Sequence, residues 1–265
     1  MRHSLAVILL LTLTACSLLE PLPDGTNQPT LLSAAELYDQ AKTELNDGNY
    51  STAVTLYEKL QSRYPYGRYA QQALLEAAYA NYRQGESAAA ISAADRFIKQ
   101  YPNHPHIDYA YYVKGLANFG GEISLLKSLG GQDPTERDPK AAQDAFAAFK
   151  DLVTRFPNSK YTHDSRLRMQ YLVNALAKYE VHVASYYLRR GAHIAAVNRA
   201  QGVLTLYPNS PSTRDALEVM AQGYDAMGMT DLRDDAKRVL AKNTSAAEAV
   251  SGEPITGKSW WQFWK

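Results

Sequence analysis

The strongest constraint on the fold of this chain is an internal repeat of 37 residues. Glycine and proline recur at fixed distances, with 17 residues from a glycine to the following proline and 20 residues from that proline to the next glycine. The marker residues are Gly48, Pro65, Gly85, Pro102, Gly191, Pro208 and Gly228. Proline ends one helix and permits the next to begin. A repeat of this length is typical of a solenoid, in which each unit covers its apolar face by stacking on its neighbours.

Between these markers the apolar residues fall at helical spacing. In the first unit they are Leu37, Ala41 and Leu45 before the glycine, and Ala53, Leu56, Tyr57 and Leu60 after it. Each unit is therefore predicted to be a helical hairpin. Because 46% of the residues are hydrophobic, the chain can bury a core and is not disordered by composition. The predicted fold class is all-α, an α-solenoid of about five hairpins.

These hairpins resemble tetratricopeptide repeats, which place small residues at a close helix crossing, a glycine at the turn, and then alanine, an aromatic residue and proline. Small residues lie seven positions before each turn: Ala41, Ala78, Gly115, Ala184 and Ala221. The resemblance covers residues 33–242, although the period is 37 instead of the usual 34. We interpret the three extra residues as a longer loop or final turn.

Two units depart from the period. An insert of 18 residues in the third unit falls at 120–138 and contains two glycine pairs, which predicts a long loop inside that hairpin. An insert of 14 residues precedes the fourth turn, but residues 161–190 contain neither glycine nor proline. This segment is predicted to be one helix about 45 Å long, at 1.5 Å per residue. The fifth unit has Arg233 where alanine is expected and is interpreted as a capping repeat.

The amino terminus predicts export and lipid attachment. Arg2 precedes an apolar stretch at residues 5–13, which is too short to span a bilayer and is typical of a signal peptide. The string Leu13-Thr14-Ala15-Cys16 resembles a bacterial lipobox, which implies cleavage before Cys16 and attachment of a diacylglycerol and an acyl chain to it. Cys16 is the only cysteine of the chain. The alternative is a secreted protein with an unrelated free thiol.

The predicted organisation has five parts. Several prolines and Gly25 precede the first repeat, and they favour a tether over a regular helix. The parts are a signal peptide (1–15), a lipidated cysteine and tether (16–32), repeats one to three (33–157), repeats four and five (158–242) and a disordered tail (243–265).

Charge and motif content argue against nucleic-acid binding and catalysis. The chain has 28 basic and 27 acidic residues and no basic run, so we expect no nucleic-acid partner. It contains none of the motifs HExxH, GxSxG and GxxxxGK. The string His104-Pro105-His106 is interpreted as a surface turn, with a metal site as the alternative. We expect a protein that is not an enzyme and has no cofactor apart from the lipid on Cys16.

In tetratricopeptide arrays the positions thirteen, ten, six and three residues before the turn glycine line the concave face. In repeats one to three they include Tyr38, Lys42, Tyr79, Tyr82, Tyr109, Tyr112 and Phe119. We predict that these residues form a groove for an extended, aromatic-rich peptide, because aromatic walls supply apolar contact and hydroxyls can bond a peptide backbone. The alternative is that the tyrosines pack between repeats. In repeat five the same positions are acidic or amide residues, so the two ends differ.

Four local strings add a more specific resemblance. They are Arg63-Tyr64-Pro65-Tyr66-Gly67, Asp95-Arg96-Phe97-Ile98, Ala177-Lys178-Tyr179-Glu180 and Val197-Asn198-Arg199. Together with the lipobox and five repeats, they resemble the BamD family, also called the competence lipoprotein ComL family.

This resemblance implies a lipid-anchored, non-enzymatic scaffold on the periplasmic face of the outer membrane, within the β-barrel assembly (Bam) complex. Ser17 after the cysteine agrees with that destination in enterobacterial lipoproteins. The implied partners are unfolded outer-membrane proteins, bound by the first repeats, other Bam lipoproteins, and the barrel subunit BamA, docked by the last repeats. Arg199 is carried over as a docking residue, with a solvated surface arginine as the alternative.

The carboxyl terminus falls outside this resemblance. It holds four large aromatic residues: Trp260, Trp261, Phe263 and Trp264. Three roles are open for them: an interfacial membrane anchor, a plug for a partner's pocket, or a mimic of aromatic signal peptides that occupies the groove of its own chain. A tail without a role is the fourth alternative. For the whole chain, the rival functions are a general periplasmic repeat adaptor linked to peptidoglycan or cell division, and an unrecognised hydrolase.

Overall fold

The computed structural model describes residues 32–128 and 139–250, and places side chains for residues 32–120 and 139–242. These parts are helical and contain no strand. The helices are α2 (Ala34–Asn46), α3 (Tyr50–Arg63), α4 (Arg68–Arg83), α5 (Ser87–Gln100), α6 (Ile107–Ser128), α7 (Lys140–Arg155), α8 (Thr162–Arg189), α9 (His193–Leu206), α10 (Thr213–Ala226) and α11 (Thr230–Val250).

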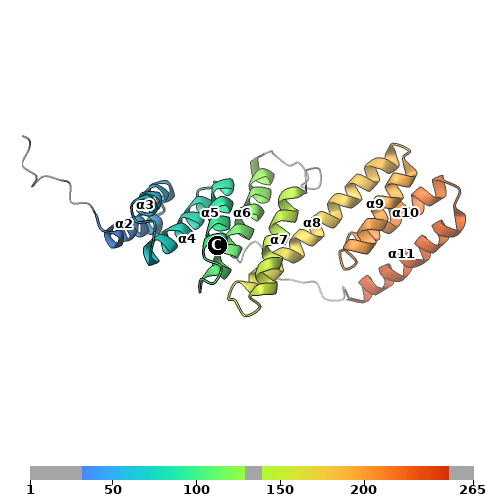
Figure 1. The fold of residues 1–265 in the computed structure, drawn as a ribbon. Coiled ribbons are helices and arrows are strands. Elements are labelled where there is room, and N and C mark those ends of the chain that lie inside the picture. Colours follow the sequence, from blue (N-terminus) through green and yellow to red (C-terminus); the bar gives the residue numbers. More distant parts are fainter. Residues whose placement is uncertain (1–31, 129–138, 251–265) are drawn as a thin grey trace, which may run out of the picture.

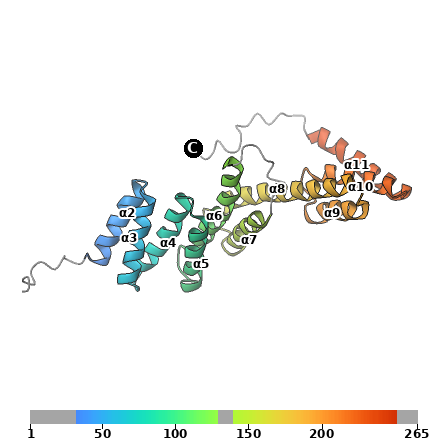
Figure 2. The same cartoon turned by 90° about the horizontal axis from the view of Figure 1, so that it is seen from above.

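The helices pair as five hairpins that stack into an elongated array (Figure 1). Each helix packs mainly against the preceding and the following one, and first helices of adjacent hairpins also touch, as in α2 with α4, α4 with α6 and α8 with α10. The view from above shows the same one-dimensional order (Figure 2). The predicted all-α solenoid of five hairpins is therefore confirmed.

The turn inside a hairpin requires glycine. Gly48, Gly85, Gly191 and Gly228 have φ values of 83°, 89°, 75° and 72°, in the left-handed region that costs other residues energy. Each glycine follows the end of a first helix, where this conformation satisfies carbonyl groups that the helix leaves open. The 37-residue spacing of these glycines therefore reflects the left-handed backbone conformation that each regular unit requires at its turn.

The first helix is fastened at its start. Ser33 and Glu36 form a capping box in which each side chain bonds the other residue's backbone N–H, at 3.3 and 2.7 Å. These bonds lower the pKa of the Glu36 carboxyl below its usual value. Just before the cap, the Leu32 carbonyl accepts a hydrogen bond of 2.9 Å from the Tyr64 hydroxyl. The chain thus enters the array beside the segment that joins α3 to α4.

Close helix crossings explain the small residues. Ala41, Ala78 and Ala184 are fully buried, and Ala221 is nearly so. At the same position of the third hairpin, a Cβ added to Gly115 would lie within 3 Å of three ring carbons of Phe149. The core is thus built from alanine, leucine and single large rings that interlock between neighbours.

The structure bears out the long helix and corrects two boundaries. Helix α8 has 28 residues, without a break through the 14-residue insert. Helix α6 continues through Gly120 to Ser128, so the loop predicted from residue 120 is wrong for those residues, and its remainder at 129–138 lies outside the described residues. Glycine costs a helix only about 1 kcal/mol, which tertiary packing can offset. Helix α11 continues to Val250, so the tail boundary predicted at 242 falls inside a helix, where good helix formers such as alanine prolong it.

Within these described segments, no helix combines the length and apolar character that a membrane crossing requires.

Candidate functional site

The predicted groove residues lie on the first helices of the hairpins, and six of the seven are partly exposed. The seventh, Phe119, is only 4% exposed and packs in the core with Phe149. Phe119 therefore follows the packing alternative, while the other six offer part of their surface to a ligand.

Five tyrosines, on α4, on α6 and immediately before α8, form a continuous series of ring contacts. Tyr79 and Tyr82 of α4 have ring centroids 6.4 Å apart, and Tyr79 lies 6.3 Å from Tyr109 of α6. Tyr161, at the start of α8, lies 5.3 Å from Tyr109 and stacks on Tyr112 at 4.6 Å. We call Tyr79, Tyr82, Tyr109, Tyr112 and Tyr161 the aromatic row. It joins repeats two, three and four along their first helices.

The long helix α8 extends the same surface. Tyr171 lies 5.6 Å from Phe119, edge to face, and the guanidinium of Arg168 lies 4.8 Å above the Phe119 ring. Tyr161 and Tyr171 were not predicted as groove residues because the 14-residue insert places them outside the repeat period. The absence of glycine and proline from residues 161–190 was the only available signal.

Hydrogen bonds fix two members of the row. The Tyr112 hydroxyl donates to Asp164 Oδ2 at 2.7 Å, and Arg168 Nε donates to the same oxygen at 2.7 Å. Burial, together with this carboxylate, raises the pKa of Tyr112 well above its usual range, so the phenol stays protonated. The Tyr79 hydroxyl accepts a bond of 2.7 Å from Arg83.

The hydroxyls of Tyr82 and Tyr109 differ from those of Tyr79 and Tyr112 in their hydrogen bonding. Among the described residues, neither hydroxyl forms a hydrogen bond. Desolvation by burial raises the pKa of Tyr109 far above 10, so it too remains a donor at neutral pH. The row therefore combines fixed ring faces with two hydroxyls that can still bond a peptide backbone.

A second aromatic cluster lies at the amino-terminal end. Tyr38 contacts Tyr57 and Tyr69 at 6.0 and 5.6 Å between ring centroids. Burial, with a smaller contribution from Glu76, raises the pKa of Tyr38 to about 12. Lys42 forms an ion pair of 2.7 Å with Glu76, which links α2 to α4. Glu76 was missed in the sequence because it lies outside the groove positions of the repeat.

The proposed docking residue Arg199 lies on α9, half exposed. Its guanidinium donates to Glu180 Oε2 of α8 at 2.9 Å, and this bond raises the pKa of Arg199. The ion pair joins two of the strings that carried the family resemblance, 177–180 and 197–199. A guanidinium has five N–H donors, so one bonded nitrogen leaves others for a partner.

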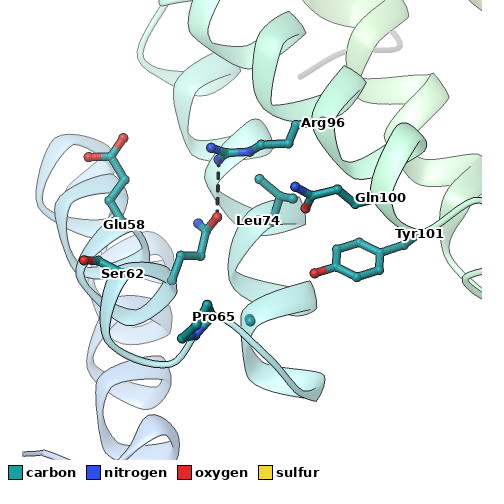
Figure 3. Close-up of a pocket in the computed structure, with 9 residues that line it drawn as sticks. Glu58, Ser62, Pro65, Leu74, Arg96, Gln100 and Tyr101 are labelled. Atoms are coloured by element: carbon teal, nitrogen blue, oxygen red, sulfur yellow. Dashed lines mark hydrogen bonds between the residues drawn. The ribbon is translucent and has the colours of Figure 1, made fainter.

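The other two strings meet at a pocket of about 410 Å³ that is lined by residues of α3, α4 and α5 and of the loops after α3 and α5 (Figure 3). Pro65 and Arg96 both line it, and Arg96 donates to Gln61 at 3.2 Å. The pocket contains no predicted groove residue. Its lining residues are Glu58, Gln61, Ser62, Pro65, Ala70, Leu74, Arg96, Gln100 and Tyr101.

The remaining candidate residues divide into two groups. In the predicted surface turn, the backbone N–H of His106 donates to His104 Nδ1 at 3.1 Å, which occupies that ring nitrogen. Cys16 and the tail aromatics Trp260, Trp261, Phe263 and Trp264 lie outside the described residues.

Stacked helical hairpins with an aromatic row along their first helices define a helical-repeat scaffold of the tetratricopeptide type. The amino-acid sequence assigns the chain to a particular family within this class. The profile of the YfiO family, described as outer membrane lipoproteins, matches residues 32–239, and the chain belongs to this family.

Relatives from several bacteria resemble the chain over most of its length. A protein of Neisseria meningitidis serogroup B, named outer membrane protein assembly factor BamD, is 41% identical over 98% of each chain. Proteins of the same name from Xylella fastidiosa (strain Temecula1) and Vibrio cholerae are 40% and 37% identical, over 84% and 79% of this chain and 75% and 87% of the relatives.

Proposed function

We propose that this chain is a lipid-anchored, non-enzymatic scaffold on the periplasmic face of the outer membrane that helps the Bam complex to insert β-barrel proteins. Its family and the names of relatives that align over nearly the whole chain support this role. The observation that carries the binding mechanism is the aromatic row, with two hydroxyls that no group of the described protein engages.

The proposed ligand is an extended, aromatic-rich segment of an unfolded outer-membrane protein. An extended chain presents alternate side chains on one face and backbone N–H and C=O groups along its edges. Tyrosine rings of the row supply apolar contact for the side chains, while Tyr82 and Tyr109 bond the backbone. Binding of this kind tolerates many sequences, as a factor with many clients requires.

The proposed docking contact for the barrel subunit BamA centres on Arg199. Glu180 holds the guanidinium in one orientation, which lowers the entropy lost when a partner carboxylate binds the nitrogens that remain. Arg199→Ala is expected to weaken co-purification with BamA, whereas Arg214→Ala, an exposed arginine on α10, serves as the matched control. Retention of BamA by Arg199→Ala at the level of the control would refute this assignment.

Hydroxyl-deletion variants test the peptide site without removing the rings. We expect the double variant Tyr82→Phe, Tyr109→Phe to bind a fluorescent C-terminal peptide of an outer-membrane protein about tenfold more weakly, because each hydrogen bond contributes about 0.5–1.5 kcal/mol. Tyr186→Phe, at the exposed far end of α8, is the control. Unchanged affinity in the double variant and in Tyr79→Ala, with circular dichroism preserved, would exclude the row as the binding site.

A pull-down separates the proposed role from the rival adaptor role. The lipidated protein, purified gently from outer membranes, is expected to retain a β-barrel partner in stoichiometric amount. Recovery of peptidoglycan-binding or cell-division proteins in its place would favour the general adaptor. Replacement of Cys16 by Ser is expected to release the protein from the membrane fraction, because the covalent lipid supplies the anchor.

A further inference from the structure

The segments that join one hairpin to the next share a positive charge, which neither the proposed peptide site nor the proposed BamA site uses, although one of these segments also carries Tyr161 of the aromatic row. We define a connector as the loop between hairpins plus the last two and first two residues of the flanking helices. The connectors are 62–69, 99–108, 154–163 and 205–214. Their charged residues are Arg63, Arg68, Lys99, Arg155, Lys160 and Arg214, against the single acid Asp108, which gives a net charge of +5.

The turns inside the hairpins differ from the connectors in net charge. Defined in the same way, the described turns are 45–51, 82–88, 188–194 and 225–231. Their charged residues are Arg83, Arg189 and Arg190 against Asp47, Glu86, Asp225 and Asp231, a net charge of −1. Because successive helices are antiparallel, connectors and turns lie on opposite edges of the array. In Figure 1 the connectors after α5 and α7 lie at the lower side of the molecule.

Three of the six connector cations lie over aromatic rings. Arg68 lies 4.8 Å from the ring centre of Tyr69, and Lys160 lies 5.0 Å from that of Tyr161. Arg155 lies 5.5 Å from the ring centre of Tyr111. A ring orients a cation without neutralising it. These three side chains therefore keep a full positive charge in the first and third connectors.

Carboxylates do not balance these charges. Across the ion pairs of the described segments, Arg214 is the one connector cation that meets a carboxylate, Glu218, at 3.4 Å. The single connector acid, Asp108, accepts a hydrogen bond of 2.6 Å from Ser159. The edge therefore presents uncompensated positive charge to its surroundings.

Exposed apolar groups lie on both edges, since the turns expose Ile194 and Met229, but the connectors combine such groups with a net positive charge. Tyr66, in the first connector, is 90% exposed, and Leu206, in the last, is 68% exposed. Tyrosine is enriched at the level of lipid headgroups because its ring is apolar and its hydroxyl polar. Cations interspersed with exposed apolar side chains are the composition that binds an anionic bilayer surface.

The chain also leaves the array on this edge. Leu32, the first described residue, bonds Tyr64 of the first connector. Cys16 lies sixteen positions before Leu32, and sixteen residues span at most about 55 Å even when fully extended. If Cys16 is lipidated, as we propose above, the bilayer surface therefore lies within about 55 Å of the first connector.

We propose that the connector edge is a docking surface for an anionic phospholipid bilayer, so that the array lies with this edge against the membrane that anchors it. The lipid prevents escape, and the connector charges set the orientation. The aromatic row then keeps one orientation relative to the bilayer into which clients are inserted. The inference uses the proposed anchor only for the position of the membrane.

Vesicle binding tests the edge independently of the anchor. The mature chain from residue 16, with Cys16→Ser to prevent acylation, is sedimented with vesicles of phosphatidylethanolamine and phosphatidylglycerol at 3:1, and with phosphatidylcholine vesicles. The edge variant combines Arg63→Gln, Arg68→Gln, Arg155→Gln and Lys160→Gln. The control combines Arg189→Gln, Arg190→Gln, Lys237→Gln and Arg238→Gln, which removes the same charge elsewhere.

We expect binding to the anionic vesicles only, weakened at least tenfold in the edge variant and by less than twofold in the control. A charge-conserving variant, with lysine at positions 63, 68 and 155, is expected to bind like the parent chain, and its retained binding separates loss of charge from loss of fold. If the edge and control variants lose vesicle binding equally, binding depends on the net charge of the protein and not on the connector edge, and the proposal is overturned. Equal binding to both vesicle types, or to polyglutamate and not to vesicles, would overturn it as well. None of these outcomes depends on client binding or on Cys16.

Discussion

Gly115 allows the most direct test of the packing behind the aromatic row. The residue lies inside α6, where an alanine would ordinarily stabilise the helix by about 1 kcal/mol. A Cβ at this position, however, would lie within 3 Å of three ring carbons of Phe149, whose side chain is fully buried. Overpacking a core costs about 1–3 kcal/mol. Since the ring has no room to retreat, we expect Gly115→Ala to lower the free energy of unfolding by about 1–2 kcal/mol.

A double-mutant cycle isolates this contact. Phe149→Leu removes the ring atoms that clash and is itself expected to cost about 1–2 kcal/mol. In that background Gly115→Ala no longer meets the ring, so the helix propensity of alanine dominates and the substitution stabilises by about 0.5–1 kcal/mol. The sign of the Gly115→Ala effect therefore reverses between the two backgrounds, with a coupling energy of about 2 kcal/mol.

The assay is urea unfolding of the four proteins, followed by circular dichroism and compared through midpoints at a constant slope. The near-ultraviolet signal of tyrosine gives a second readout, because the Phe149 ring lies 6.3 Å from both Tyr112 and Phe119. If Gly115→Ala stabilises the protein equally in both backgrounds, the close crossing of α6 and α7 does not exist as described.

Three further predictions concern other parts of the array. Tyr57 is fully buried and its hydroxyl has no partner in the described segments, so Tyr57→Phe is expected to raise the free energy of unfolding by about 1 kcal/mol at pH 7. Burial also raises the pKa of Tyr57 above its unfolded value near 10, so ionisation of the unfolded chain lowers the stability of the parent protein by about 1 kcal/mol between pH 10 and pH 11 through this residue, and urea titrations in this range should show a flatter decline for the phenylalanine variant. Gly48→Ala, at a φ of 83°, is expected to destabilise by about 1 kcal/mol, whereas Gly202→Ala in α9, where a Cβ meets nothing within 4 Å, is expected to stabilise by about 0.5–1 kcal/mol; thermal melts giving both the same sign would contradict the turn assignment. Arg233→Ala removes bonds of 2.8 Å to Asp225 and Asp234, so amide hydrogen exchange should quicken in α11 and stay unchanged in the first three hairpins; equal protection in α11 would show that these exposed pairs do not hold the end of the array.

Periodic backbone requirements made most of the fold predictable. A glycine such as Gly85 marks a turn because the left-handed conformation excludes most other residues, and this holds wherever the turn recurs. The small residue at Ala184 marks a helix crossing for a similar steric reason. These requirements are local, so they can be read from spacing alone.

Features that depend on tertiary contact were not predictable in this way. The glycines at 120 and 121 favour a loop by local propensity, yet α6 continues through them, because stacking of hairpins outweighs a cost of about 1 kcal/mol per glycine. Tyr161 joins the aromatic row only because the insert in α8 places it against Tyr112. The partnership of Lys42 with Glu76 depends on how two hairpins stack, which no single unit specifies.

Helix α8 has a mechanical consequence for the two proposed binding regions. It carries Asp164, which holds Tyr112 of the aromatic row, and Glu180, which holds Arg199. The two acids lie sixteen residues apart on one unbroken helix, a separation of about 24 Å along the axis and about 160° around it. Helix α8 therefore connects the aromatic row and Arg199 through a single unbroken helix. Because the two acids lie on nearly opposite sides of the helix, a rotation of α8 about its axis would move Asp164 and Glu180 in nearly opposite lateral directions.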